Sequence, residues 1–204
     1  MKNKSTLIAF SFAIVAGISL TSCSGTKKEE AATETHDHAT EVKADSASTA
    51  KAQFAVDAAF QKQLGDVFTA YITLKEAFVA TDAAKVKAEA TTTQQALTKV
   101  DMMLLTGPAH HDWMTYLEGM NASLKEIAAA TDIEAQRKAF STLSDRLYKS
   151  IKAYGLAGTT AYYEFCPMAF DNQGAFWLSD NDKIRNPYFG DKMLSCGSVK
   201  ETIQ

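Results

Sequence analysis

Repeating apolar residues between Phe54 and Tyr154 constrain the fold more than any other feature of the chain. They recur at steps of three and four residues, which places side chains on one face of an α-helix. The first run comprises Phe60, Leu64, Val67, Phe68, Tyr71, Leu74 and Phe78. This run predicts a helix that ends near Ala80.

Two further helices are indicated by turn signals and renewed apolar repeats. Thr81-Asp82 can cap a second helix. Its apolar stripe continues to Leu104, and Gly107-Pro108 then interrupts it. A third helix is expected to begin near Pro108 and to stop before Thr131.

The fourth apolar repeat is the most regular and runs from Ile133 to Tyr154. Thr131 and Glu134 have the spacing of a capping box at its start, and Gly155 provides a stop signal at its end. Four helices joined by very short turns must lie beside their neighbours in sequence. We therefore predict an all-α fold, an antiparallel up-and-down four-helix bundle over residues 52–158.

Composition supports this class and excludes one kind of partner. The 204 residues include only ten glycines and three prolines, which argues against a turn-rich β-fold. The formal net charge is -3, so the chain lacks the basic excess that neutralises nucleic-acid phosphates. We expect no nucleic-acid partner.

The N-terminus carries the features of an export signal. Lys2 and Lys4 precede an apolar stretch from Leu7 to Leu20, which is too short for a permanent membrane span. Leu20-Thr-Ser-Cys23 resembles the lipoprotein box, in which the cysteine is lipidated. We therefore expect residues 1–22 to be a signal peptide and Cys23 to carry the lipid that anchors the protein to a membrane. The alternative is an ordinary signal peptide that is cleaved nearby, with a cysteine at position 23 by chance.

Residues 23–51 are polar and contain almost no large apolar side chain, which predicts a disordered tether. Within it, His36-Asp37-His38 could capture a metal ion, although chance placement in a linker is the favoured interpretation. A lipid anchor places the protein in the cell envelope. We expect the outer membrane, facing the periplasm, with surface exposure as the alternative suggested by the charged run Lys27-Lys-Glu-Glu30.

After Thr159 the helical period disappears, and residues 159–204 form a cassette that we assign to the same domain. Its turn-forming residues are Pro167, Gly174, Pro187, Gly190 and Gly197. These residues and the many aromatic side chains predict compact loops or short strands packed on the bundle.

Two sulfur pairs are the most distinctive chemical feature of the cassette. Cys166-x-Met168 and Met193-x-x-Cys196 would give four soft ligands if they met in space. Thiolates and thioethers select soft cations, so such a site would prefer Cu(I) or Ag(I).

Two other interpretations of these cysteines stay open. An exported chain whose Cys23 is lipidated keeps an even pair, and Cys166 and Cys196 could form a disulfide. Alternatively, His110 and His111 could join them in a tetrahedral zinc site, which is the less expected metal. An intact disulfide and a metal site exclude each other.

The cassette also resembles a known family. The motifs are Cys166-Pro-Met-Ala, Gly174-Ala-Phe-Trp-Leu-Ser, Asn186-Pro-Tyr-Phe-Gly and Met193-Leu-Ser-Cys-Gly. They resemble the periplasmic domain of unknown function 3347, found in lipoproteins and as a C-terminal extension of copper/silver-type efflux adaptors. The resemblance implies a role in metal efflux, with an efflux adaptor as a partner.

The leading hypothesis is therefore a non-enzymatic, lipid-anchored protein that binds soft metal ions. The alternative is a disulfide-stapled interaction module with no metal role. The sequence contains no nucleophile elbow, no phosphate-cradling glycine loop and no His-Glu-x-x-His motif, so we do not expect an enzyme.

Overall fold

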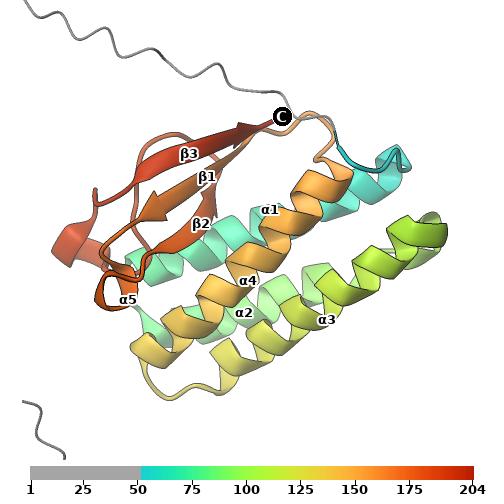
Figure 1. Cartoon of the computed structure of the whole chain (residues 1–204). Helices are drawn as coiled ribbons and strands as arrows, with labels where there is room; N and C mark the ends of the chain where they lie inside the picture. Colours follow the sequence, from blue (N-terminus) through green and yellow to red (C-terminus); the bar gives the residue numbers. More distant parts are fainter. Residues whose placement is uncertain (1–51) are drawn as a thin grey trace, which may run out of the picture. The chain divides into compact units, whose positions relative to one another are not determined.

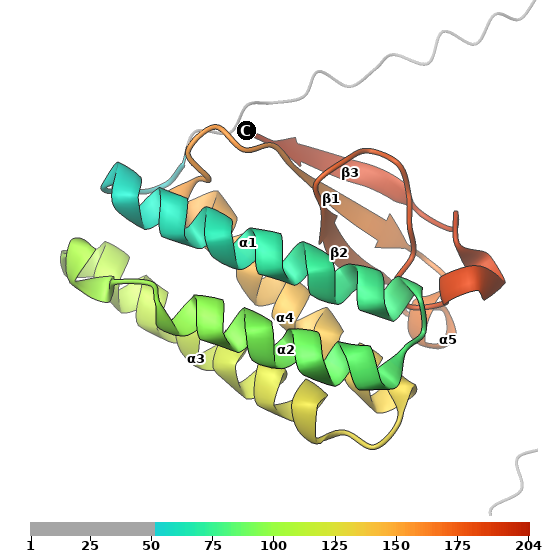
Figure 2. The ribbon, with the colours of Figure 1, turned by 180° about the vertical axis from the view of Figure 1, so that it is seen from behind.

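Four long helices come first in residues 52–204, the residues that this computed structural model describes (Figure 1). They are α1 (Ala58–Val79), α2 (Ala83–Thr98), α3 (Gly107–Ala129) and α4 (Ile133–Tyr154). Consecutive helices pack against each other, and α1 also contacts α4 (Figure 2). This is the antiparallel bundle that the sequence predicts. The predicted signal peptide, Cys23 and the tether with its His36-Asp37-His38 sequence lie outside the described residues.

Aspartates begin three of the long helices. The side chains of Asp57, Asp82 and Asp132 each accept a hydrogen bond from a backbone N–H in the first turn, which supplies a partner for an otherwise unbonded donor. The predicted cap at Asp82 is thus confirmed. The prediction of Thr131 as the cap of α4 is wrong, because Asp132 takes that role.

The second helix is shorter than predicted. It ends at Thr98, and a separate 3-10 turn, η1 (Met102–Leu104), follows it. The break occurs at Asp101, whose backbone N–H donates to Gln63 Oε1 and whose side chain accepts from the N–H of Met103. These two bonds start a new turn where the apolar stripe alone predicts a continuous helix.

The cassette folds into a small antiparallel sheet, so the fold is mostly helical and not purely all-α as predicted. Short strands were one of the two forms expected for the cassette. Its strands are β1 (Ala161–Cys166), β2 (Ala175–Ser179) and β3 (Ser198–Ile203), in the order β2-β1-β3. A short helix, α5 (Ala169–Asn172), joins β1 to β2, and a 3-10 turn, η2 (Gly190–Met193), precedes β3. The connections therefore carry three of the four cysteine and methionine residues of the cassette, Met168, Met193 and Cys196.

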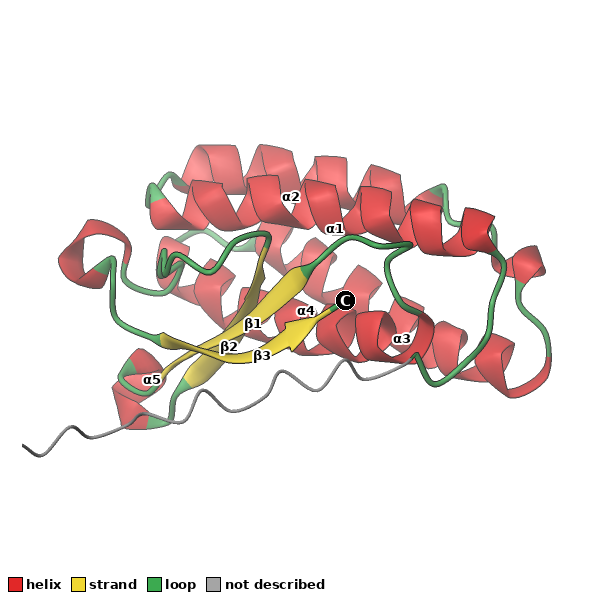
Figure 3. Cartoon of the chain, turned by 90° about the horizontal axis from the view of Figure 1, so that it is seen from above, coloured by secondary structure: helices red, strands yellow, loops and turns green. Residues whose placement is uncertain are grey.

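The sheet covers the side of the bundle formed by α1 and α4 (Figure 3). Tyr71 on α1 accepts a hydrogen bond from the backbone N–H of Leu178 on β2. Tyr148 on α4 stacks on Tyr163 of β1, with ring centroids 3.8 Å apart. The helices and the sheet thus share one core.

Aromatic side chains fill both ends of this core, as the sequence predicts. At one end, Trp113 meets the rings of Phe60 and Tyr154 edge to face. Toward the other end, Phe140 stacks on Tyr71. Each such buried ring stabilises the fold by roughly 1.5–3 kcal/mol. Within residues 52–204, no helix combines the length and apolar character needed to cross a bilayer.

Candidate functional site

The pairing of β1 with β3 brings the two cysteines of the cassette together. Phe165 pairs with Ser198, so Cys166 ends β1 where the segment leading into β3 carries Cys196. The two Sγ atoms lie 2.7 Å apart, and both cysteines are free thiols. Cys166 is fully buried and Cys196 is partly exposed. The sequence prediction that these residues become neighbours therefore agrees with the fold.

Asn186 holds the segment that carries Cys196. Its Nδ2 donates to the carbonyl oxygen of Cys196 over 2.8 Å, and its backbone N–H donates to the carbonyl of Leu194. Its Oδ1 accepts from the backbone N–H of Tyr188, which closes a local turn. Asn186 is fully buried, so these bonds are shielded from water. The residue therefore positions Cys196 without touching its sulfur.

Arg137 attaches this segment to the bundle. From the first turns of α4, its Nε donates to the carbonyl of Pro187 over 3.0 Å and its Nη2 donates to Thr81 Oγ1. Gly190 packs against the same place with a φ of 57°, a backbone angle that favours glycine. Arg137 is not predictable from the sequence, because a single arginine on a helical repeat gives no signal of a distant carbonyl partner.

The two predicted methionines line a cavity next to the cysteines. The cavity has a volume of about 390 Å³, and Met168 and Met193 share its wall with Phe170, Tyr188 and the acidic residues Asp171 and Glu134. We call the cluster of Cys166, Met168, Met193 and Cys196 the sulfur corner. All four sulfur-bearing residues that the sequence singles out thus lie in one region.

The cavity wall includes a strained turn. Phe170, Asp171 and Asn172 have φ angles of 50°, 55° and 66°, in the left-handed region. Each non-glycine residue held there costs about 1–2 kcal/mol. The hydrogen bond from the N–H of Gly174 to the carbonyl of Ala169 closes this turn.

The Cys196 thiol of the sulfur corner is a weak acid. Burial, together with the hydrogen bond and charge of the Cys166 thiol, raises the pKa of Cys196 to about 11. A soft cation must displace this thiol proton to bind, because the thiolate is the metal ligand. The thioethers of Met168 and Met193 carry no proton and can bind at any pH.

The separation of the two Sγ atoms bears on both chemical interpretations. At 2.7 Å it is longer than a disulfide bond of about 2.0 Å. Metal–sulfur bonds are about 2.3 Å, so sulfurs that share an ion stand roughly 3.5–4.5 Å apart. The sulfurs would have to approach by less than about 1 Å for an external oxidant to remove two electrons and two protons and leave a disulfide, whereas metal binding requires them to separate by roughly 1–2 Å.

The structure does not bring the predicted histidines to the sulfur corner. His110 and His111 lie in the first turns of α3, where Tyr154 Oη donates to the carbonyl of Ala109. Tyr154 ends α4, whereas Arg137, which contacts the cysteine-bearing segment, lies near its start. The intervening helix is about 25 Å long at 1.5 Å per residue. A single zinc site made of these histidines and cysteines is not formed.

No group of three or more His, Cys, Asp and Glu side chains in residues 52–204 is arranged to hold a metal ion. The two thiols therefore need methionine sulfur to complete a set of more than two ligands. This donor set suits soft cations and does not suit Mg²⁺ or Ca²⁺.

A buried carboxyl group lies in the same strand as Cys166. Glu164, two residues before Cys166 on β1, is fully buried and faces Trp177 across the strand pair. Burial raises the pKa of Glu164 to about 7, against the opposing attraction of Lys75. Lys75 is itself fully buried and forms an ion pair of 2.8 Å with Glu76. In the sequence Glu164 is one acidic residue within an aromatic segment, and no local pattern indicates that it is buried.

Comparison with known proteins adds one finding. No curated protein and no solved structure matches the chain. A family model matches over residues 67–159, which extend from within α1 to just beyond α4. The matched segment does not include the cassette motifs between Cys166 and Gly197, which carry the resemblance seen in the sequence. The helical part of the chain is therefore similar to the family described as Protein of unknown function (DUF3347).

Proposed function

We propose that this chain is a lipid-anchored envelope protein that binds a soft metal ion, Cu(I) or Ag(I), at the sulfur corner. Cys23 supplies the membrane anchor, and the ion is either buffered there or handed to a heavy-metal efflux adaptor. The supporting observation is the gathering of Cys166, Met168, Met193 and Cys196 from separate segments into one region. No catalytic role is part of the proposal.

The four side chains have different roles in this proposal. Cys166 and Cys196 bind the ion as thiolates and contribute most of the affinity. Met168 and Met193 are weaker thioether ligands at the cavity. Met168 is 46% exposed, so it can meet an incoming ion before the buried Cys166 does. Exchange between the thioethers and thiolates then carries the ion in or out.

Anaerobic titration with Cu(I) tests the proposal. We expect the reduced full chain to bind one tight equivalent against a competing chelator. The paired variant C166S/C196S should lose this equivalent, and M168L/M193L should keep it with weaker affinity, because leucine fills the space without the sulfur. Since each bound thiol releases its proton, the apparent affinity should rise as pH increases toward the Cys196 pKa of about 11.

The comparison of the two paired variants makes the outcome decisive. Equal Cu(I) binding by the parent chain and by C166S/C196S would contradict the proposal. Circular dichroism of each variant shows whether the fold has been kept.

A second candidate function is an interaction module that the cysteines staple through a disulfide. The observation that favours it is the short Sγ–Sγ separation of 2.7 Å. Mass spectrometry of the chain with and without reductant distinguishes the candidates. A bond between Cys166 and Cys196 that survives isolation and resists mild reductant favours the staple, whereas two free thiols favour the metal site.

A further inference from the structure

Exposed apolar side chains gather at the end of the bundle that carries η1. In residues 52–204, the exposed large apolar residues are Phe176 and four methionines, Met102, Met103, Met114 and Met168. Met102 and Met103 are consecutive in η1, where they are 39% and 79% exposed. An apolar side chain gains nothing from facing water, so two adjacent ones indicate a contact surface.

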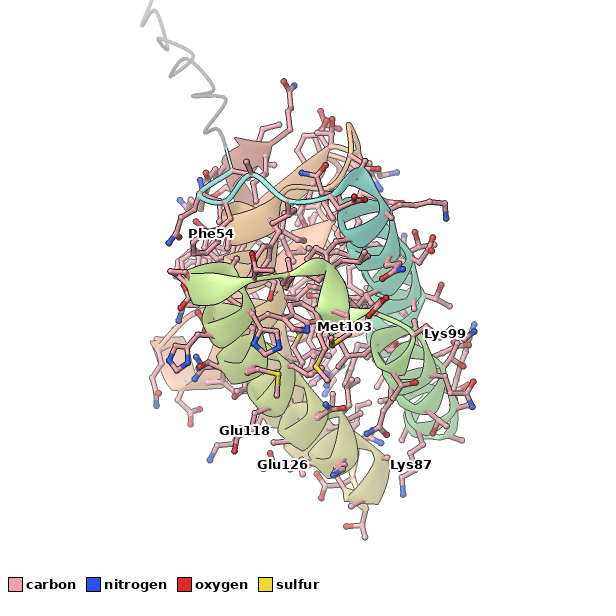
Figure 4. All side chains as sticks on the ribbon, turned by 90° about the vertical axis from the view of Figure 1, so that its right-hand side faces the viewer. Phe54, Lys87, Lys99, Met103, Glu118 and Glu126 are labelled. Carbon is pink, nitrogen blue, oxygen red and sulfur yellow. The ribbon has the colours of Figure 1, made fainter. Side chains whose placement is uncertain are left out.

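The first residues of the described domain lie beside η1. Phe54 and Val56, which precede α1, line a hollow of about 290 Å³ together with Leu104, the last residue of η1. All three side chains are half-buried. The backbone N–H of Phe54 donates to the carbonyl of Ala153, which ties the same segment to the end of α4. Figure 4 views this end of the molecule, with Phe54 and Met103 labelled. We define the apolar end as Phe54, Val56, Met102, Met103 and Leu104.

Charged side chains flank the apolar end. Asp57 follows Val56 and Asp101 precedes Met102, and the carboxylate of each aspartate accepts a hydrogen bond from a nearby backbone N–H. Lys99, at the end of α2, is exposed and carries the opposite charge. Exposed apolar surface with a polar rim is typical of protein or membrane contacts. Zwitterionic phospholipid headgroups carry both signs of charge, so they suit a rim of this kind.

The place of the apolar end in the chain favours a membrane over a protein partner. The apolar end contains Phe54, so the chain enters the domain there, after the segment that connects it to Cys23. The composition of residues 24–51 predicts a coil with a mean span of roughly 30 Å. A bilayer that holds a lipid on Cys23 is therefore within reach of the apolar end at a high effective concentration. Weak apolar contacts suffice for docking under these conditions.

We propose that the apolar end docks on the surface of the lipid bilayer and inserts Met102 and Met103 among the lipid headgroups. The proposal rests on the lipid anchor of the proposed function, and it adds an orientation. The cavity of the sulfur corner is lined by Glu134 at the start of α4, whereas Phe54 is bonded to the end of the same helix. At 1.5 Å per residue, α4 is roughly 30 Å long. The docked protein therefore presents the sulfur corner away from the bilayer.

Fluorescence quenching by brominated phosphatidylcholine vesicles tests the docking. The chain used is residues 23–204, which keep the whole described domain, with both cassette cysteines changed to serine. The thiol of Cys23 then couples to a maleimide phospholipid in the vesicles, which supplies the anchor whether or not cells lipidate this residue. Circular dichroism shows that each coupled chain is folded.

The substitution M103W places an indole on the apolar end. Its fluorescence should fall about twofold or more in brominated vesicles, because docked side chains lie roughly 5–10 Å within the boundary of headgroups and acyl chains. The parent chain, whose two tryptophans are fully buried, gives the background.

Further substitutions identify the docking surface. M168W places the same indole on an exposed methionine of the sulfur corner, and it should be quenched no more than the background. Added to M103W, M102S should reduce the quenching by about half or more, because it removes apolar contact with the lipid. M114S is the matched control and should leave the quenching unchanged. Met114 is 40% exposed, against 39% for Met102, but it lies about 10 Å along α3 from the start of that helix.

Equal quenching of M103W and M168W would overturn the proposal, since the domain would then have no preferred face toward the bilayer. Unchanged quenching on adding M102S would overturn it as well. A blue shift of M103W emission that grows with protein concentration without vesicles would assign the surface to a second copy of the chain instead. None of these results bears on Cu(I) binding or on lipidation of Cys23, which the mass of the isolated protein reports. The two proposals can therefore fail independently.

Discussion

Glu164 has neither of its carboxylate oxygens hydrogen-bonded to another group in residues 52–204, although the side chain is fully buried. Burial of an ionised carboxylate is costly, so the protonated form is favoured and the pKa rises from 4.5 to about 7. In the folded protein this group binds a proton more tightly than in the unfolded chain. The contribution of this protonated carboxyl group to the free energy of unfolding is complete below pH 4.5. It is lost as the pH rises through 7.

The E164Q variant tests this prediction. Glutamine keeps the shape but cannot ionise, and Lys75 keeps its ion pair with Glu76. We expect nearly equal melting temperatures for variant and parent at pH 4. At pH 8 the variant should be more stable by roughly 1–3 kcal/mol. Thermal unfolding followed by circular dichroism measures both.

The exposed carboxylate of Glu126 provides the control for that comparison. E126Q should change the melting temperature little at either pH, because its side chain stays in water. A pH profile of E164Q that matches the parent would show that Glu164 is ionised without cost in the fold.

Individual residues also show which parts of the candidate site the sequence could predict. The soft chemistry of Cys166, Met168, Met193 and Cys196 is visible from residue type alone, and the fold brings them together. The roles of Asn186 and Arg137 depend on bonds to backbone carbonyls far away in sequence. No local pattern carries such information, so these positioning residues emerge only from the structure.

At the scale of elements, the helices were predictable in more detail than the sheet. The sequence predicted short strands as one possible form of the cassette, but neither their bounds nor their pairing. The stripes from Phe60 to Tyr154 repeat over many turns, whereas β1 has only six residues. In β1 the buried positions include Glu164, and the half-buried positions Tyr163 and Phe165 are aromatic. The usual alternation of buried apolar and exposed polar residues is therefore absent from β1, which conceals the bounds of the strand.

The turn that joins η2 to the bundle provides an element-scale prediction. A Cβ at Gly190 would contact Thr81 and lie 2.8 Å from the carbonyl oxygen of Val79, and the positive φ there is unfavourable for alanine. G190A should therefore destabilise the fold by roughly 1–3 kcal/mol. It should also slow oxidation of the cysteines, because the displaced turn leads to Cys196. Thermal unfolding and thiol quantification measure the two effects.

Gly65 in α1 is the matched control, since nothing lies within 4 Å of a Cβ built there. Alanine has the higher helix propensity, so G65A should stabilise the protein by about 0.5–1 kcal/mol. Equal effects of the two substitutions would mean that the close packing around Gly190 does not matter for stability.

At the scale of the whole molecule, a bond between Cys166 and Cys196 would close a loop of 30 residues. The loop-entropy model gives a stabilisation of about 3–4 kcal/mol for a loop of this size. Oxidation of the parent chain should therefore raise its melting temperature by roughly 6–15 °C. Differential scanning calorimetry with and without reductant measures this difference.

The C166S/C196S variant should show no dependence on reductant in the same measurement. If the parent and this variant respond alike, the bond does not form or does not stabilise the fold. A melting temperature that rises on adding Cu(I) to the reduced parent would instead point to metal as the stabilising agent.

The two tryptophans have a practical consequence for separating these events. Trp113 packs against Phe60 at the end of the bundle that carries His111. Trp177 packs against Gly197, the residue after Cys196, so closely that a Cβ added to this glycine would lie 2.8 Å from the indole ring. Each indole is sealed from solvent and surrounded by different groups. One intrinsic fluorophore therefore lies beside the sulfur corner and the other lies at the far end of the bundle. Replacing Trp113 by phenylalanine leaves Trp177 as the single optical probe of events at the cysteines.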